Sequence, residues 1–350
     1  METQTPKKSG YSMPAEWEKH EATWAVFPHN ENTWPERLEI AQKAYAEMVA
    51  QISTGERVEL LVRNERIKKL ASELIFAHRF AVKENVRFHT IETMDSWIRD
   101  AGPTFVVNRK EKKLAMVEWI FNAWGMKYEH EEPLSADKIV PGKLNEILKL
   151  KKFSPGIVME GGSVEVNGKG IVITTEQCLL NKNRNPKLKR EEIENYLLEY
   201  LGANKVIWLG EGIEGDDTDG HVDDIARFVN EKTVLCCMPD ESDEKNYSAM
   251  AKNKEKLVKA GLKVMDLPMP GKLMVDGVDG KKRRLPASYA NFYISNAAVI
   301  VPIFGVENDM KALGIIAAAF PGRKIVGIRS TEVVFGFGAY HCMTQQQPSV

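Results

Sequence analysis

The chain has 350 residues, of which 43% are apolar and 28% charged, and its formal net charge is −1. This is the composition of a globular protein with a sizeable core, and the near-neutral balance offers no basic surface for nucleic acid or an anionic membrane. No apolar run reaches the roughly 20 residues that span a bilayer, and residues 1–14 lack the apolar segment of a signal peptide. The sequence therefore disfavours nucleic-acid-binding and membrane proteins.

The predicted elements alternate short β-rich runs with amphipathic helical stretches along the whole chain. The predicted strands, in chain order, cover residues 23–28, 57–62, 104–107, 114–119, 156–159, 170–174, 205–208, 225–229, 233–237, 298–302 and 324–328. The predicted helices cover residues 35–52, 66–79, 143–152, 190–201, 243–260 and 309–320. This order of elements is typical of an α/β protein.

The recurring unit is two or three strands with one helix, and it occurs about five times. A hairpin signal at 166–169 (VNGK) indicates antiparallel neighbours within a unit. The pattern therefore predicts mixed sheets rather than a doubly wound parallel sheet. No linker divides the chain, so we expect a single domain over residues 1–350, with 1–12 as a flexible lead-in. The Pro- and Gly-rich segment 268–286 is interpreted as a solvated loop, with a mobile flap over a pocket as the alternative.

Four cysteines are present, with neither a CxxC pair nor the spacing of a disulfide framework: Cys178, Cys236, Cys237 and Cys342. This usage indicates reduced thiols and a cytoplasmic protein. Cys342 lies in a glycine-rich segment beside polar residues, and glycines allow a tight backbone that exposes a thiol. From this segment alone, a reactive thiol and a buried inert cysteine are equally good interpretations.

His221 and Asp223 lie two residues apart in the acidic run 216–224. On an extended segment such residues point to the same face, so both could enter one cavity. A calcium-binding loop would need an acid at its first position and Glu at its twelfth, where the chain has Gly215 and Ala226. A zinc site would need further His or Cys at ligand spacing, which the neighbouring sequence lacks. An acidic surface turn remains the alternative.

Two further segments place acids where functional sites are often built. Glu160 ends an apolar run and is followed by two glycines, which puts it at a predicted strand tip. The segment 95–104 (DSWIRDAGPT) begins with Asp95 and also holds an Arg-Asp pair. From the sequence alone, Glu160 could be an exposed turn residue, and the Arg-Asp pair could be a surface ion pair of little energetic value.

Together these segments supply one thiol, one imidazole and several carboxylates that could converge. A Cys-His-Asn protease needs one polar group to orient its histidine and has no use for several acids. A planar guanidinium, by contrast, has five N–H donors in a rigid fork that bidentate carboxylates match. Two such carboxylates, at about 1.5–3 kcal/mol per charge-assisted hydrogen bond, could hold and orient the group. The set therefore favours a hydrolase of guanidinium compounds.

The chain resembles the agmatine deiminases and, more broadly, the bacterial-type peptidylarginine deiminase family of the guanidine-modifying pentein superfamily. The resemblance covers nearly the full length in an ordered series of motifs. They are MPAEW at 13–17, WAVFP at 24–28, DSWIRDAGPT at 95–104, FNAWG at 121–125, EGGS at 160–163, NKNRNP at 181–186, GHVD at 220–223, ASYANFY at 287–293 and HCMTQQ at 341–346. The chain departs from the family at Asp219, where Asn is usual, and at residues 335–340. These departures bear on substrate preference and leave the residues of the expected chemistry intact.

The resemblance implies a five-bladed α/β propeller built around a central active site. It also implies roles for individual residues: Cys342 as nucleophile, His221 as general acid and base, and Glu160 as the acidic partner of that histidine. Asp95 and Asp223 would hold the guanidinium.

Asp217 matches the family position that contacts the distal amine of agmatine, and Trp97 and Trp119 are further expected substrate contacts. No metal or organic cofactor is expected.

The function implied is hydrolysis of agmatine to N-carbamoylputrescine and ammonia, a step of putrescine and polyamine metabolism, through a covalent thiouronium on Cys342. One alternative is a peptidylarginine deiminase that converts protein arginine to citrulline, which would need an open site. The other is a non-catalytic binder of polyamines or arginine derivatives, which would have no need of a thiol. The sequence offers no strong candidate arginine for a substrate α-carboxylate, which favours agmatine. The expected partner is thus a small cationic substrate; a homodimer stays an open possibility.

Overall fold

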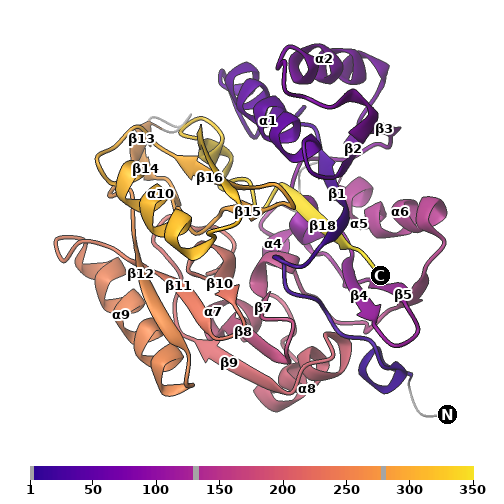
Figure 1. Ribbon diagram of the computed structural model, residues 1–350. Helices are drawn as coiled ribbons and strands as arrows, with labels where there is room; N and C mark the ends of the chain where they lie inside the picture. The colour runs from indigo at the N-terminus through magenta and orange to yellow at the C-terminus, as the bar shows by residue number, and fades with distance from the viewer. Residues whose placement is uncertain (1–3, 129–133, 277–280) are drawn as a thin grey trace.

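The computed structural model describes residues 4–128, 134–276 and 281–350 (Figure 1). Its strands are β1 (His20–Val26), β2 (Arg57–Val62), β3 (Val86–Thr90), β4 (Thr104–Asn108), β5 (Lys113–Val117), β6 (Lys151–Phe153), β7 (Glu165–Val166), β8 (Ile171–Thr175), β9 (Lys205–Leu209), β10 (Ala226–Asn230), β11 (Thr233–Met238), β12 (Lys263–Pro268), β13 (Met274–Asp276), β14 (Lys282–Arg284), β15 (Tyr293–Ile294), β16 (Ala298–Ile303), β17 (Lys324–Arg329) and β18 (Thr344–Pro348). The longer helices are α1 (Leu38–Ser53), α2 (Glu65–Phe76), α6 (Val140–Leu148), α8 (Arg190–Tyr200), α9 (Glu244–Lys259) and α10 (Asn308–Ala319).

Five small mixed sheets share one topology, and Figure 1 shows them following one another around the molecule in chain order. They are β4-β5-β6, β7-β8-β9, β10-β11-β12, β15-β16-β17 and β18-β1-β2-β3. In each sheet the first strand runs antiparallel to the second, and the second runs parallel to the third. The mixed α/β architecture predicted from the sequence is therefore confirmed.

A helix lies in every connection between parallel strands of the described residues. Parallel neighbours need such a crossover because a short turn cannot return the chain to the same end of the sheet. The sequence encodes these helices by an apolar stripe: in α1 the buried Ala41, Tyr45, Met48, Val49 and Ile52 recur at helical spacing.

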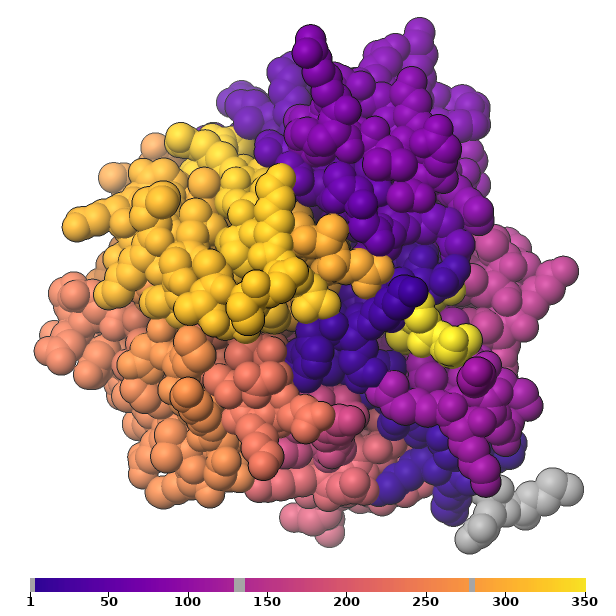
Figure 2. All heavy atoms as spheres, in the orientation of Figure 1, coloured from indigo at the N-terminus to yellow at the C-terminus, as the bar shows by residue number. Residues whose placement is uncertain are grey.

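The two ends of the chain meet in one sheet. β18, at the C-terminus, pairs with β1, near the N-terminus, with Thr344 opposite Ala25 and Pro348 opposite His20. In Figure 2 the last residues emerge as a small yellow patch between indigo and magenta segments. This pairing fixes the position of Cys342, which lies two residues before β18.

Short turns precede the first strand of each sheet, and they position the polar groups discussed below. The turns α3 (Ile98–Ala101), η3 (Gly161–Ser163) and η4 (Val222–Asp224) precede β4, β7 and β10 respectively. Asp100, Glu160 and Asp223 therefore come from equivalent places in three successive sheets. Asn291 precedes β15 in the same way, and Cys342 precedes β18.

Several details differ from the sequence-based expectation. Residues 4–12, expected to be a flexible lead-in, are packed: η1 (Lys7–Ser9) is followed by Tyr11, which is buried, and by Ser12, which bridges to Val107. Segment 268–286 holds the hairpin β13-β14, and its residues 277–280 lie outside the described part of the chain. The predicted strand at 156–159 contributes only a single bridge, between Val158 and Ile120. No described helix has the length and apolar character to cross a bilayer.

Candidate active site

A cavity of about 230 Å³ opens beside Cys342. Its lining comes from widely separated segments and includes four side chains that the sequence singled out: Cys342, Asp95, Trp97 and Asp217. It also includes Asp100, Trp124, Tyr128 and Arg283, which had no assigned role. The cavity thus combines one thiol with several carboxylates and aromatic rings.

The Cys342 thiol is almost fully buried and has two polar neighbours. Asn291 Nδ2 donates a hydrogen bond to Sγ over 3.0 Å, and Asp223 Oδ2 lies 3.6 Å from Sγ. Burial, followed by the carboxylates of Asp223, Asp224 and Asp100, raises the pKa of the thiol well above its usual value, and the Asn291 bond offsets only part of this. The resting thiol is therefore protonated at neutral pH.

His221 is buried in the loop before η4, next to Asp100, whose Oδ1 lies 3.7 Å from His221 Nδ1. Neither ring nitrogen has a hydrogen-bond partner among the described residues. Burial alone would lower the pKa of the imidazole, but Asp100, Cys178 and Glu160 raise it, and the net pKa lies well above the usual value. A protonated imidazole at this position has a proton ready for a leaving group.

Gly162 marks the point where three of these side chains converge. A Cβ there would lie 2.6 Å from His221 Nδ1, 2.9 Å from Asp100 Oδ1 and 3.0 Å from Asp223 Oδ2. Any side chain at this position would collide with all three groups. The backbone N–H of Gly162 instead donates to Asp100 Oδ1 over 2.9 Å. The glycine of the EGGS motif therefore makes room for a cluster of catalytic-type side chains.

Asp223 is held in place by a buried chain of charges. His341 Nδ1 hydrogen-bonds Asp223 Oδ2 at 2.7 Å, and His341 Nε2 hydrogen-bonds Glu16 Oε2 at 2.8 Å. Glu16 in turn pairs with Arg227 at 2.9 Å. Burial raises the pKa of Asp223, but the His341 bond together with the nearby charges of His341, His221 and Arg227 outweighs it, and the net pKa is lowered. Asp223 is thus an anion whose Oδ1 has no hydrogen-bond partner in the described chain.

Asp100, rather than Asp95, lies next to His221, where the guanidinium-binding acid of the 95–104 motif was expected. Its carboxylate lies beside His221 and accepts hydrogen bonds from Gly162 N and Trp124 Nε1, both at 2.9 Å. Asp95 also lines the cavity, but its carboxylate accepts from Ser96 N at 2.8 Å and from the Thr33 hydroxyl. The acid of the 95–104 motif that joins His221 and Asp223 is therefore Asp100.

A sequence signal for Asp100 does exist. Asp100 is followed by Ala101-Gly102, just as Glu160 is followed by Gly161-Gly162, and both pairs lead into the first strand of a sheet. An acid followed by two small residues before such a strand therefore marks Asp100, like Glu160, as a candidate site residue.

Glu160 is fully buried beside the catalytic-type cluster. Arg184 Nε donates to its Oε1 over 2.7 Å, whereas its Oε2 has no partner in the described residues. Arg184 also bonds Asp219 Oδ2 at 2.6 Å, which connects Glu160 to the loop that carries Asp217. The Asp217 carboxylate accepts from the Tyr128 hydroxyl, and burial raises its pKa to about 6.

The two tryptophans expected to contact substrate lie in different places. Trp97 lines the cavity and packs against Trp34, with ring centroids 5.5 Å apart. Trp119 is in the core behind β4: its Nε1 donates to Thr104 Oγ1 at 3.0 Å and its ring contacts Tyr200. The structure does not bring Trp119 to the cavity. Arg283 also lines the cavity; it lies in segment 268–286, which was interpreted as a solvated loop or, alternatively, as a flap over a pocket.

The fold and this cluster define a class. Residues 12–348 match the Porphyromonas-type peptidyl-arginine deiminase family, and the chain belongs to that family.

Within it, a protein provisionally named as an agmatine deiminase from Legionella pneumophila (strain Paris) is 39% identical over 351 residues, which are 98% of this chain and 97% of that protein. The agmatine deiminase of Enterococcus faecalis, solved catalysing its reaction, is 35% identical, with a TM-score of 0.89 and coverage of 100% and 99% of the two chains. A substrate-bound cysteine-to-serine variant of agmatine deiminase from C. jejuni is 33% identical, with a TM-score of 0.86 and 96% of each chain covered.

Proposed function

We propose that this protein is an agmatine deiminase, a hydrolase that converts the guanidinium group of agmatine to a ureido group and releases ammonia. The observation that carries the proposal is the convergence at Gly162 of His221, Asp100 and Asp223, with the Cys342 thiol 3.6 Å from Asp223. The relatives named as agmatine deiminases support the same activity.

In this proposal the guanidinium lies between the carboxylates of Asp100 and Asp223, each accepting N–H donors. Binding of the guanidinium displaces the proton of the Cys342 thiol to solvent, and the resulting thiolate attacks the central carbon to form a tetrahedral adduct. His221 protonates one amino group, and the C–N bond breaks to release ammonia and leave an S-alkylthiouronium. His221 then takes a proton from water, which attacks the same carbon. As the C–S bond breaks, the proton of the added hydroxyl passes to the Cys342 sulfur and N-carbamoylputrescine leaves.

The charge of the substrate activates the thiol. In the free enzyme, burial and nearby carboxylates raise the pKa of Cys342, so the thiol keeps its proton at neutral pH. A bound guanidinium places a positive charge among those carboxylates and reverses their effect.

We therefore expect alkylation of Cys342 by iodoacetamide in the free enzyme to be slow at pH 7 and to accelerate only above the ordinary thiol pKa of about 8.5. Peptide mass spectrometry would follow the rate at each pH. An apparent pKa well below 7 in the free enzyme would contradict substrate-assisted activation.

His221 acts first as the acid for the departing ammonia and then as the base for water. His221→Ala is expected to lower kcat by about 100-fold or more while the affinity for agmatine largely survives, because general acid-base catalysis is lost and the carboxylate clamp is kept. Stopped-assay ammonia release and equilibrium dialysis would measure the two quantities. Unchanged turnover would remove His221 from the chemistry.

Agmatine is favoured over other guanidinium compounds by Asp217 and by the size of the cavity. Asp217, on the cavity wall, can receive the distal ammonium, and 230 Å³ lies below the roughly 300–1,000 Å³ of pockets for larger ligands. Arg283 also lines the cavity, and its guanidinium could instead bind the α-carboxylate of free arginine. A peptidylarginine deiminase would have to admit a peptide backbone.

The deciding experiment measures ammonia release from agmatine, free arginine and a blocked arginine peptide in parallel. We expect agmatine to give the highest kcat/KM. Asp217→Asn should raise the KM for agmatine with a smaller change in kcat, because Asp217 contacts the end of the substrate that does not react. A higher kcat/KM for the arginine peptide would reverse the assignment.

The shared topology of the five sheets supports a five-bladed propeller in which each sheet is one blade. In this arrangement the turns before the first strands face a common centre. We further propose that residues 1–350 form a single catalytic domain, that the protein is cytoplasmic and that it is a homodimer. Sedimentation would test the homodimer.

A further inference from the structure

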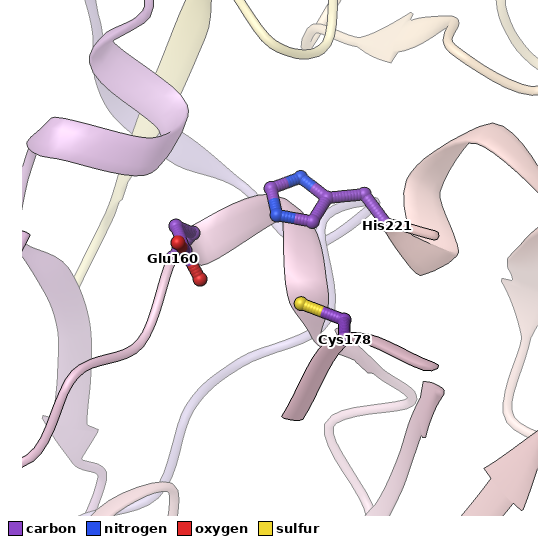
Figure 3. Close-up of side chains that lie close together, drawn as sticks. All are labelled: Glu160, Cys178 and His221. Atoms are coloured by element: carbon purple, nitrogen blue, oxygen red, sulfur yellow. The ribbon is translucent and has the colours of Figure 1, made fainter. Parts of the chain in front are cut away.

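A second thiol lies beside the candidate catalytic histidine. Cys178, Glu160 and His221 bring one sulfur, one carboxylate oxygen and one ring nitrogen within 4.8 Å of one another. Figure 3 shows the three side chains pointing toward a common space. All three are buried, and the reaction proposed above uses His221 but gives Cys178 no step.

The donor atoms of this cluster are free to bind a ligand. Both ring nitrogens of His221 and the Oε2 of Glu160 lack hydrogen-bond partners in the described part of the chain, although they are buried. Buried polar atoms are nearly always paired, because losing water without replacement costs about 1–3 kcal/mol per group. A buried histidine and a buried carboxylate that both carry unpaired atoms beside a thiol therefore indicate a place for a further ligand.

The position of Cys178 is fixed by the fold. Thr175 Oγ1 accepts the N–H of Cys178 at 3.2 Å and so caps the short helix α7 (Glu176–Leu179). The same hydroxyl donates to the carbonyl of Gly220, next to His221, at 2.6 Å. One threonine thus ties the segment of Cys178 to the loop of His221.

Thiolate, imidazole and carboxylate are the donors that zinc prefers in proteins. Bond lengths of about 2.0–2.3 Å around a tetrahedral ion place the ligand atoms roughly 3.3–3.7 Å apart, so side chains that now lie within 4.8 Å of one another need to close by at most about 1.5 Å. With His221 neutral and Cys178 deprotonated, the set carries two negative charges, which match a divalent cation. Three protein ligands leave a fourth position for water.

We propose that Glu160, Cys178 and His221 form a binding site for a thiol-preferring divalent cation such as Zn²⁺, and that the bound ion inhibits the enzyme by occupying His221. Binding replaces the proton of Cys178 with the metal and releases that proton, and the proton of the imidazolium, to solvent. The metal-bound imidazole keeps only a weakly acidic N–H on its other nitrogen and has no free lone pair. It is therefore a poor acid for the leaving ammonia and cannot take a proton from water. The inhibition rests on the proposed deiminase function, whereas the metal site does not.

Cobalt binding tests the site without any assay of turnover. Co²⁺ added to protein stripped with EDTA should give the near-ultraviolet thiolate-to-cobalt absorption band. We expect the band to persist in Cys342→Ala and in Cys236→Ala, a control at another buried cysteine, and to vanish in Cys178→Ala and Cys178→Ser. Absence of the band in the unaltered protein, or its loss in Cys342→Ala with retention in Cys178→Ala, would overturn the proposal.

Zinc inhibition of ammonia release from agmatine tests the consequence. EDTA-stripped enzyme should be fully active, and the Zn²⁺ concentration for half inhibition should rise at least tenfold in Cys178→Ser but stay unchanged in Cys236→Ala. Serine keeps a polar group next to His221, so the basal activity of Cys178→Ser should remain within a few-fold. Equal zinc sensitivity of Cys178→Ser and the unaltered enzyme would refute inhibition through this site. A protein that binds Co²⁺ through Cys178 but shows no deiminase activity would refute the proposed function alone.

Discussion

Cys342→Ala is expected to abolish ammonia release from agmatine, with a loss of about 10⁴-fold or more in kcat, because removing a covalent nucleophile leaves only binding and electrostatic effects. The structure also indicates that Cys178 cannot restore the activity of this variant. Cys178 is held by Thr175 in a separate segment beside Glu160 and His221 and is not part of the cavity lining, so it cannot take the place of Cys342.

The alanine variant should still fold and bind substrate. Cys342 is a small side chain at the cavity surface, and the carboxylates of Asp100 and Asp223 are retained. Thermal unfolding should therefore show stabilisation by agmatine in the variant as in the unaltered protein. The buried Cys236→Ala serves as the matched control and should keep near-full activity. Residual turnover above about one per cent in Cys342→Ala would be incompatible with a covalent role, given the size of the loss expected.

Asp100→Asn should give the second largest effect, a loss of about 10²–10⁴-fold in kcat/KM for agmatine. Two charge-assisted hydrogen bonds to the guanidinium, at about 1.5–3 kcal/mol each, would be lost or weakened. An amide would also present N–H donors to the guanidinium and to Trp124 Nε1, which now donates to Asp100 Oδ2 over 2.9 Å. Steady-state kinetics with agmatine would measure the loss.

Asp95→Asn is the matched comparison, since both acids lie in one motif and line one cavity. An asparagine oxygen at position 95 can still accept from Ser96 N and Thr33, so we expect a loss of less than about tenfold, as for an exchange of one neutral hydrogen bond. A larger loss for Asp95→Asn than for Asp100→Asn would restore Asp95 as the guanidinium ligand and refute the assignment drawn from the structure.

Much of the architecture was predictable because it depends on apolar periodicity. The helices at 35–52, 190–201, 243–260 and 309–320 and most central strands follow directly from the spacing of buried residues. The strands that were missed are β3, β6, β7, β12, β15 and β18, which are all edge strands of the five mixed sheets, and the hairpin strands β13 and β14. The central strands fix where the missed edge strands pair.

β18 shows why such a strand escapes prediction. Its sequence TQQQP carries no apolar alternation, yet Gln345, Gln346 and Gln347 are buried. Their amides hydrogen-bond partners far away in sequence: Trp24 Nε1 donates to Gln347 Oε1 at 2.8 Å, and Gln345 Nε2 donates to the Pro103 carbonyl at 2.7 Å. Only the tertiary structure supplies these partners, so local sequence could not indicate a buried strand.

The site was predictable in its residue types and less so in its geometry. The choice between Asp95 and Asp100 depends on whether α3, which holds Asp100, or the segment before it, which holds Asp95, lies against His221, and a motif that contains both acids cannot decide this. Cys178 was passed over as a zinc ligand because it lies 43 positions before His221, and the two come together only through Thr175 and Gly220.

The central claim, a covalent intermediate on Cys342, is tested most directly by rapid acid quenching of the enzyme during turnover of agmatine, followed by digestion and mass spectrometry. The Cys342 peptide should carry an added mass equal to agmatine less one ammonia, and the peptides of Cys178, Cys236 and Cys237 should carry none. An unmodified Cys342 peptide at every quench time, or the same adduct on Cys178 instead, would contradict the account.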